Sequence, residues 1–206
     1  MTSGPLVPAL ERPSAAREAI FAAATRLFGE RGYSGTTMRD IAKAVGILPG
    51  SLYAHIESKE AVLVEIIEGG VDRFNDAVAE VRALDLGPEA ALRAAVHRHL
   101  EIVAENPQRT LIVFHQWRFL AEDNRSRLLL KRATYEEFFI ATLRDGMATG
   151  VFDSRLDPKV TVLGILGALN WTPEWYSPQG SATPAEIADK IADSLLGGAL
   201  ARTERA

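Results

Sequence analysis

Two short stretches on either side of Gly46 constrain the fold of this chain more than any other part of its sequence. Ile41 and Ala42 lie on one face of a first short helix, and Gly46 follows where the chain must reverse with a positive φ. Leu52 and Ile56, four residues apart, give a second short helix an apolar side. The small side chain of Ala42 lets the two helices cross closely. This pattern predicts a helix-turn-helix.

Glycine, proline and capping residues divide the rest of the chain into further helices. No stretch alternates apolar and polar residues over the length of a strand, so the expected fold class is all-α. We expect an N-terminal three-helix domain over residues 14–58 that contains the helix-turn-helix, and a C-terminal helical bundle over 59–206. Residues 1–13 contain three prolines and a glycine, which predicts a flexible tail. The expected helices are 14–31, 37–45, 49–55, 59–83, 88–105, 107–120, 123–149, 157–172 and 183–200.

Composition excludes several kinds of protein. The chain has no cysteine, which excludes disulfides, thiolate zinc sites and cysteine nucleophiles and fits a cytoplasmic location. No apolar run approaches the ~18 to 20 residues of a membrane span, so no membrane partner is expected. The net charge is −4, but residues 1–60 carry 7 Lys and Arg against 6 Asp and Glu. A nucleic-acid site therefore has to be local and in the first third of the chain.

The outward residues of the predicted helix-turn-helix have the chemistry that duplex DNA requires. In this motif the second helix enters the major groove with its N-terminal residues first, while polar side chains around it contact phosphates. The helix that begins at Lys59 also presents free N–H groups to an anion. For any single residue, the alternative is a helical hairpin with merely solvated charges. The predicted DNA-binding residues are Thr36, Thr37, Arg39, Lys43, Leu48, Pro49, Gly50, Ser51, Tyr53, His55 and Lys59.

Residues 15–63 resemble the DNA-binding domain of the TetR family of bacterial transcriptional repressors. The resemblance implies a homodimer that binds a palindromic double-stranded DNA operator and releases it when a small molecule binds the C-terminal bundle. Leu48, Ala54 and Ile56 depart from the family pattern and leave open which base edges are contacted. The matching pieces are Phe28 with Gly32 and Tyr33, Gly35-Thr36-Thr37, Ile41-Ala42, Val45-Gly46, Gly50-Ser51-Leu52-Tyr53 and Ser58-Lys59-Glu60.

Aromatic residues at helical spacing suggest an apolar effector cavity in the C-terminal bundle; the alternative is that they fill a core, as such residues do more often. Residues 169–180 resemble the C-terminal signature of TetR-family members that sense acyl-CoA thioesters. That resemblance implies an acyl-CoA or a related apolar acid as the effector, with Arg118 as a candidate partner for its charged end. The predicted ligand-binding residues are Phe74, Phe114, Arg118, Tyr135, Phe138, Phe139 and Trp171.

The last two long helices carry apolar stripes wider than one neighbouring helix can cover. Small residues on the first of them permit close approach of a second helix, which predicts a homodimer interface; a purely intramolecular core is the alternative. The predicted interface residues are Val160, Leu163, Gly164, Gly167, Ala168, Ile187, Ile191 and Leu195.

Catalysis has little support in the sequence. There is no phosphate-binding loop, dinucleotide glycine fingerprint or nucleophile elbow. His97 and Glu101 lie four residues apart, as two metal ligands on one helix face would, but such a pair is more often a surface hydrogen bond. We expect no cofactor, no metal and no enzymatic activity. The alternative is a helical small-molecule-binding protein or enzyme without a DNA function.

Overall fold

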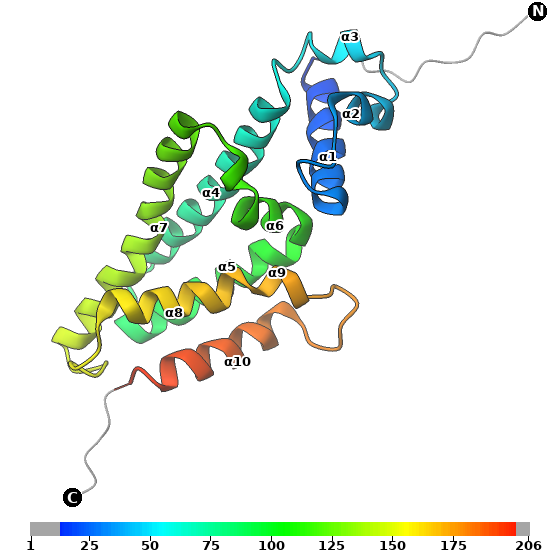
Figure 1. The fold of residues 1–206 in the computed structure, drawn as a ribbon. Helices are drawn as coiled ribbons and strands as arrows, with labels where there is room; N and C mark the ends of the chain where they lie inside the picture. Colours follow the sequence, from blue (N-terminus) through cyan, green and yellow to red (C-terminus); the bar gives the residue numbers. More distant parts are fainter. Residues whose placement is uncertain (1–12, 201–206) are drawn as a thin grey trace, which may run out of the picture.

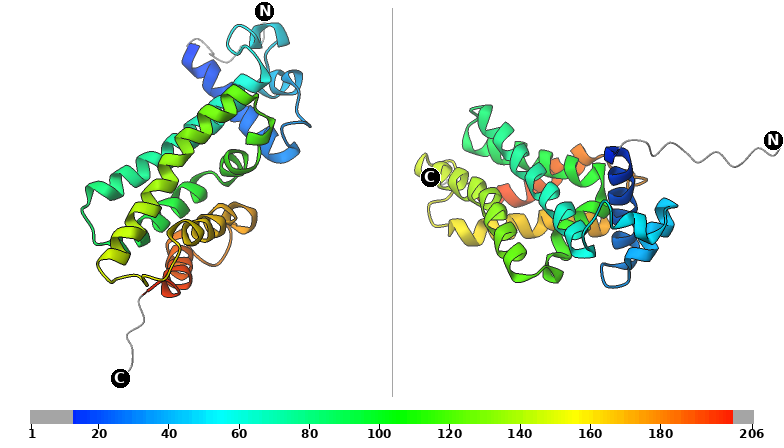
Figure 2. Two further views of the ribbon diagram at one scale, coloured as in Figure 1. Left: turned by 60° about the vertical axis from the view of Figure 1, so that its left-hand side comes forward. Right: turned by 90° about the horizontal axis from the view of Figure 1, so that it is seen from above.

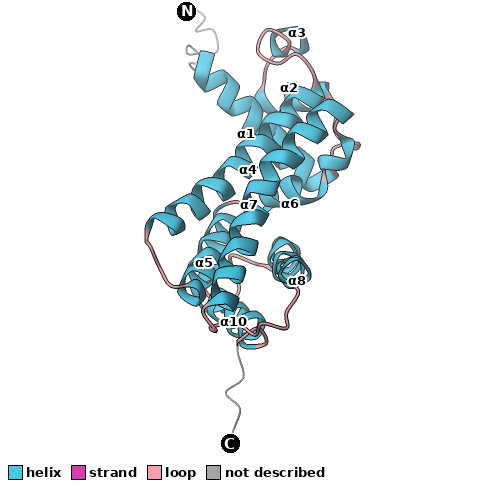
Figure 3. Cartoon of the chain, turned by 90° about the vertical axis from the view of Figure 1, so that its left-hand side faces the viewer, coloured by secondary structure: helices cyan, strands magenta, loops and turns pink. Residues whose placement is uncertain are grey.

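The computed structural model describes residues 13–200, and every regular element within that range is helical, as predicted (Figures 1 and 3). Residues 1–12, most of the predicted tail, lie outside the described residues, and Pro13 already belongs to the first helix. The elements are α1 (Pro13–Arg31), α2 (Met38–Val45), α3 (Pro49–Leu52), α4 (Lys59–Ala83), α5 (Pro88–Glu105), α6 (Pro107–His115), the 3-10 helix η1 (Trp117–Phe119), α7 (Glu122–Ala148), α8 (Pro158–Asn170), α9 (Thr172–Trp175) and α10 (Pro184–Gly197).

Local capping sets the helix ends. Thr37 and Asp40 form a reciprocal capping box at the start of α2, and the Ser58 hydroxyl accepts a hydrogen bond from a backbone N–H of α4. Gly46 ends α2 in the left-handed region, at φ 79°. These interactions are local in sequence, so the predicted bounds of the longer helices agree with the structure to within a few residues.

Three predicted helices end at least three residues earlier than expected. After Leu52 the chain continues as tight turns, because the N–H groups of Ala54 and His55 bond to carbonyls only three residues back. The predicted helix 107–120 is α6 followed by the separate turn η1, and the predicted helix 183–200 ends at Gly197. The short helix α9 follows α8 and was not predicted.

The described residues bury two apolar clusters. The first joins α1–α3 to the N-terminal half of α4, to α6 and to the start of α7, so it crosses the predicted domain boundary at residue 58. The second fills the space between the C-terminal half of α4 and helices α5, α7, α8 and α10. Phe114 on α6 contacts both clusters. The long helices α4 and α7 run side by side through the molecule (Figure 2).

Helix α6 crosses α4 at Gly69 and Gly70. A Cβ atom on Gly70 would lie 2.3 Å from Cγ2 of Val113, and one on Gly69 would lie 2.7 Å from a guanidinium nitrogen of Arg109. The crossing therefore depends on the absence of a side chain at Gly70, where the short Val113 side chain cannot move aside, whereas the long Arg109 side chain can move away from Gly69. The close approach couples the position of α6, which contacts both clusters through Phe114, to that of α4.

Candidate DNA interface and effector cavity

The helix-turn-helix stands at one end of the molecule, with α3 at its tip (Figures 1 and 3). Leu52 and Ile56 are buried and anchor α3 against α2 and α1. Leu48 is 75% exposed and Tyr53 is 56% exposed. The structure thus leaves most predicted DNA-binding residues exposed at this end of the molecule; they are Thr37, Arg39, Lys43, Leu48, Pro49, Gly50, Ser51 and Tyr53, while His55 is half-buried.

Thr36 does not belong to this surface. Its side chain is 0% exposed, and its hydroxyl donates to the carbonyl oxygens of Leu27 and Gly32, 3.2 and 3.0 Å away. The prediction that Thr36 contacts DNA is therefore wrong. Its hydroxyl instead ties the loop before α2 to the C-terminal end of α1.

Lys59 points into the protein. Its ammonium nitrogen donates to the carbonyl oxygens of Tyr33 and Thr36, both at 2.9 Å, and lies 4.1 Å from the centre of the Tyr33 ring. In this arrangement the charge of Lys59 holds the loop between α1 and α2 and does not face a phosphate, contrary to the prediction. Thr37 remains exposed, but its hydroxyl caps α2, and its hydrogen bonds lower the pKa of Asp40.

A cavity of about 220 Å³ lies between α4, α6, α7 and α8. Of the predicted ligand-binding residues, Phe74, Phe114 and Tyr135 line it. Leu163 and Gly167, predicted for the dimer interface, line it as well, so the cavity lies behind the outer face of α8. The other lining residues are Val71, Val113, Arg132, Glu136, Leu166 and Asn170.

The remaining predicted ligand-binding residues lie elsewhere. Phe138 and Phe139 are buried in the second cluster, where Phe139 packs edge-on against Tyr135 at 5.1 Å between ring centres. Trp171 is 58% exposed at the C-terminal end of α8. Arg118 follows α6 and lines a separate hollow. The prediction that Phe138, Phe139 and Trp171 line the apolar cavity is wrong, because an aromatic stripe on one helix does not show which of its neighbours encloses the empty space. That Arg118 meets the charged end of the effector stays a prediction.

Arg132 is the cation of the cavity, and the sequence analysis missed it. It lies on α7 three residues before Tyr135, so the two side chains share a helix face. Burial lowers the pKa of its guanidinium, and the carboxylate of Glu136 opposes that effect. The spacing to Tyr135 is the pattern that would have pointed to Arg132.

A buried polar pair lies next to the cavity. His99 Nδ1 is 3.0 Å from the hydroxyl of Tyr135, and the ring of His99 stacks on Phe114. Burial lowers the pKa of His99 to about 3 and raises that of Tyr135, so both groups are neutral at physiological pH. The other histidine considered above, His97, lies 2.9 Å from Asp189 on α10. Residues 13–200 contain no cluster of side chains suited to a metal ion.

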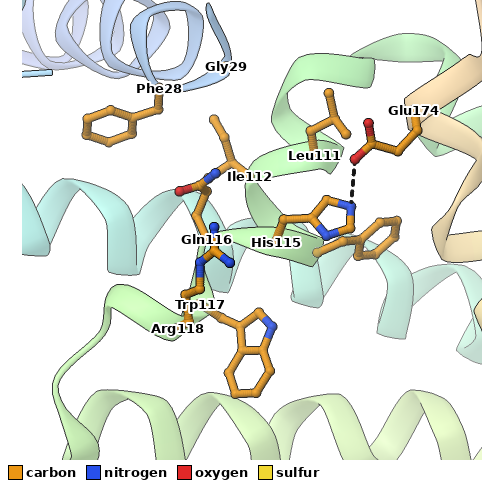
Figure 4. Close-up of a pocket in the computed structure, with 10 residues that line it drawn as sticks. Phe28, Gly29, Leu111, Ile112, His115, Gln116, Trp117, Arg118 and Glu174 are labelled. Carbon is orange, nitrogen blue, oxygen red and sulfur yellow. Dashed lines mark ion pairs between the residues drawn. The ribbon is translucent and has the colours of Figure 1, made fainter. Parts of the chain in front are cut away.

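A second hollow, of about 610 Å³, adjoins the cavity (Figure 4). Its walls come from α1 through Phe28 and Gly29, from the end of α6 and η1, and from Glu174 on α9. His115 Nε2 lies 3.2 Å from Glu174 Oε1 across it. Arg118, which lines this hollow, makes no hydrogen bond or ion pair with the described residues.

The outer face of α8 is apolar and uncovered within the chain. Val160 is 66% exposed, Leu163 is also exposed, and a Cβ atom on Gly164 or Gly167 would meet no atom within 4 Å. On α10 the fully buried side is a different one, formed by Ala188, Ala192 and Leu196. The predicted α10 interface residues Ile187, Ile191 and Leu195 are half-buried, and with Ala168 they line a groove between the two helices.

The fold and these sites define a ligand-responsive, DNA-binding transcriptional regulator, with a helix-turn-helix at one end and a cavity within its helical bundle. Residues 20–66 match the family described as bacterial regulatory proteins, tetR family, and residues 85–199 match the tetracyclin repressor-like C-terminal domain. The chain belongs to the TetR family. None of its described helices is both long enough and apolar enough to cross a membrane.

Three relatives illustrate the match. The repressor KstR2 of Rhodococcus jostii is 32% identical over 90% of this chain and 91% of its own length. The structure of the ketosteroid regulator KstR2 of Mycobacterium tuberculosis has a TM-score of 0.85 at 26% identity and covers 90% of this chain and 95% of that one. The structure of AibR with isovaleryl coenzyme A and operator DNA has a TM-score of 0.78 at 29% identity. The match covers 87% of this chain and 97% of the AibR chain.

Proposed function

We propose that this protein is a transcriptional repressor that binds a palindromic operator as a homodimer and leaves it when a CoA thioester enters the bundle. One observation carries the proposal: α4 begins beside the helix-turn-helix at Lys59 and reaches the cavity through Val71 and Phe74. A single helix thus runs from the DNA-binding region to the ligand cavity.

Exposed residues of α2 and α3 suit contacts both with DNA phosphates and with base edges in the major groove. Arg39 and Lys43 on α2 are free to reach phosphates, and the Tyr53 hydroxyl offers a further backbone contact. Leu48 and Pro49, at the N-terminal end of α3, are apolar and fit the methyl group of a thymine in the major groove. We therefore propose operator half-sites with a thymine opposite Leu48.

Dimerisation through the uncovered faces of α8 and α10 supplies a second helix-turn-helix, which binds the second half-site of the operator. The glycines on α8 allow a partner helix to approach closely, and Val160 and Leu163 supply apolar area that water otherwise covers. A two-fold dimer then places its recognition helices about one DNA turn apart, roughly 34 Å.

The effector class follows from the cavity and from the relatives. KstR2 is described as a ketosteroid regulator, and AibR was solved with isovaleryl coenzyme A. The cavity here has apolar walls with Arg132 and Asn170 among its lining residues, which suits an apolar acyl group with a polar carbonyl end. At about 220 Å³ it lies below the roughly 300 to 1,000 Å³ of most small-molecule pockets. We propose a thioester with a compact acyl group.

Release of the operator follows from a shift of α6 against α4. A ligand in the cavity presses on Val113, which lies against Gly70 at the crossing. Since α6 and α1 share the first cluster, a displaced α6 moves the DNA-binding helices. The ligand must prefer the shifted arrangement, because equal affinity for both would release nothing.

An enzyme or a carrier without a DNA function is not favoured, since the matched relatives are transcriptional regulators. We place the protein with the DNA it regulates, in the bacterial cytoplasm, and assign it no catalytic residue. The test has two steps: selecting a duplex from a random library with the full-length protein, then measuring retardation of that duplex in gels with and without CoA thioesters. The proposal is supported if the selected duplex is a palindrome and a CoA thioester releases the protein from it. Failure to select any sequence would overturn it.

A further inference from the structure

Phe114 is a shared wall between the apolar cavity and the second hollow, since it lines both of them. Its ring packs against Phe74 and His99 on the cavity side, at 5.5 and 5.8 Å between ring centres. The next residue along α6, His115, belongs to the hollow alone. The two spaces are therefore neighbours on α6 and share this half-buried aromatic side chain.

The two spaces differ in chemistry. The cavity is small and largely apolar, whereas the hollow is nearly three times as large and mainly polar. The guanidinium of Arg118 lies over the ring of Phe119 at 5.1 Å and has no anionic partner among residues 13–200. Oε1 of Gln116 is buried without a hydrogen-bond partner. The free guanidinium is suited to an anionic group, and Oε1 of Gln116 can accept a hydrogen bond from a hydroxyl or amino donor of the same ligand.

The hollow also has one wall in the DNA-binding region. Phe28 and Gly29, near the C-terminal end of α1, face the end of α6 across it, and Glu174 on α9 closes the far side (Figure 4). Glu174 is the one carboxylate of the lining, and it lies beside His115. A molecule in the hollow therefore touches α1, the turn η1 after α6 and the effector bundle at the same time.

We infer that the hollow binds the phosphate-bearing end of the effector, with Arg118 as its anchor, while the acyl end occupies the cavity on the other side of Phe114. This inference rests on the proposed function and specifies its ligand as bipartite. The acyl group selects the ligand, and the phosphate-bearing end, pressed against Phe28 and Gly29, moves α1. Trp117 in the same lining offers an aromatic face to the base of a nucleotide.

The test compares three probes on the full-length protein by calorimetry: isovaleryl-CoA, the isovaleryl thioester of pantetheine, and CoA without an acyl group. The pantetheine thioester keeps the acyl group and lacks the nucleotide. We expect it to bind about tenfold more weakly than isovaleryl-CoA, because a charge-assisted contact to Arg118 is lost. Arg118→Gln should bind isovaleryl-CoA about as weakly as wild type binds the pantetheine thioester.

Arg144→Gln is the matched control, because Arg144 lies on α7 outside both spaces and 61% of its side chain is exposed. It should bind all three probes as wild type does. In operator-release assays, the pantetheine thioester at saturation should release less DNA than isovaleryl-CoA.

Two outcomes overturn the inference while the proposed function stands: equal affinity for the two thioesters, or an Arg118→Gln variant with unchanged affinity for isovaleryl-CoA. If neither isovaleryl-CoA nor any thioester of a short- and medium-chain panel binds wild type, the proposed effector class is wrong and the inference fails with it.

Discussion

The ammonium group of Lys59 lies 4.1 Å from the centre of the Tyr33 ring and donates a 2.9 Å hydrogen bond to the carbonyl oxygen of the same residue. The first residue of α4 is therefore fastened to the loop between α1 and α2. Any movement of α4 is transmitted to the helix-turn-helix through this contact, together with the hydrogen bond from Lys59 to Thr36.

Lys59→Met should weaken operator binding without changing its salt dependence. The variant loses two charge-assisted hydrogen bonds inside the protein, which should lower the free energy of unfolding by about 2 kcal/mol. Arg39→Ala should instead reduce the slope of log K against log salt concentration by about 0.9, because a phosphate contact is lost. Fluorescence anisotropy of a labelled operator at several salt concentrations checks both. A reduced slope for Lys59→Met would show that Lys59 leaves Tyr33 to contact DNA.

Gly70→Ala should lower the free energy of unfolding by about 1 to 3 kcal/mol, because its Cβ would lie 2.3 Å from Val113 Cγ2. Urea denaturation measures this. The double variant Gly70→Ala/Val113→Ala should lose less unfolding free energy than the two single variants lose together. The control is Gly197→Ala, where a new Cβ meets no atom within 4 Å. Additive costs in the double variant would mean that the α4–α6 crossing does not depend on Gly70.

His99 should make the protein less stable as the pH falls. Its pKa is about 3 in the folded state and about 6.5 when unfolded, so between these values the unfolded state binds a proton that the folded state does not. Its contribution is fully present above pH 6.5 and declines as the pH drops below that value. From pH 7 to pH 5, wild type should lose about 2 kcal/mol more of its unfolding free energy than His99→Gln. Denaturant titrations of both proteins at the two pH values measure this difference. Equal losses in wild type and His99→Gln would contradict the lowered pKa of His99 in the folded state.

Val160→Glu should convert a dimer into a monomer of 22.4 kDa without unfolding it, because the side chain is 66% exposed in the isolated chain. A carboxylate on the apolar α8 face would have to be buried without a partner in the dimer. Leu84→Glu is the control, since Leu84 is equally exposed in the turn after α4 and lies outside that face. Light scattering gives the masses. A Val160→Glu variant that remains dimeric would place the interface elsewhere.

Sequence reasoning predicted the helices well where their ends depend on neighbouring residues. The capping box of Thr37 and the left-handed turn at Gly46 act within a few residues, and so does the start of α6 at Pro107. The end of α6 is less local, because η1 and Leu120 pack back onto the first cluster. That contact is with residues far away in the sequence.

The candidate sites could be predicted only in part, for the same reason. Thr36 and Thr37 are chemically alike, but the fold buries one against α1 and exposes the other. Tyr135 and Phe139 are one helical turn apart, yet only Tyr135 reaches the cavity. Arg132 was missed because a charged residue on a long helix is usually solvated. Only the packing of α7 on α8 shows that it is half-buried.

The affinity of the protein for isovaleryl-CoA, measured by calorimetry with and without saturating operator, tests the central claim most directly. If the effector and the operator prefer different arrangements of the protein, they must weaken each other's binding by the same factor. We predict that operator-bound protein binds the thioester more weakly, by the factor with which the thioester weakens operator binding in anisotropy. Equal affinity for the thioester with and without operator would contradict this account.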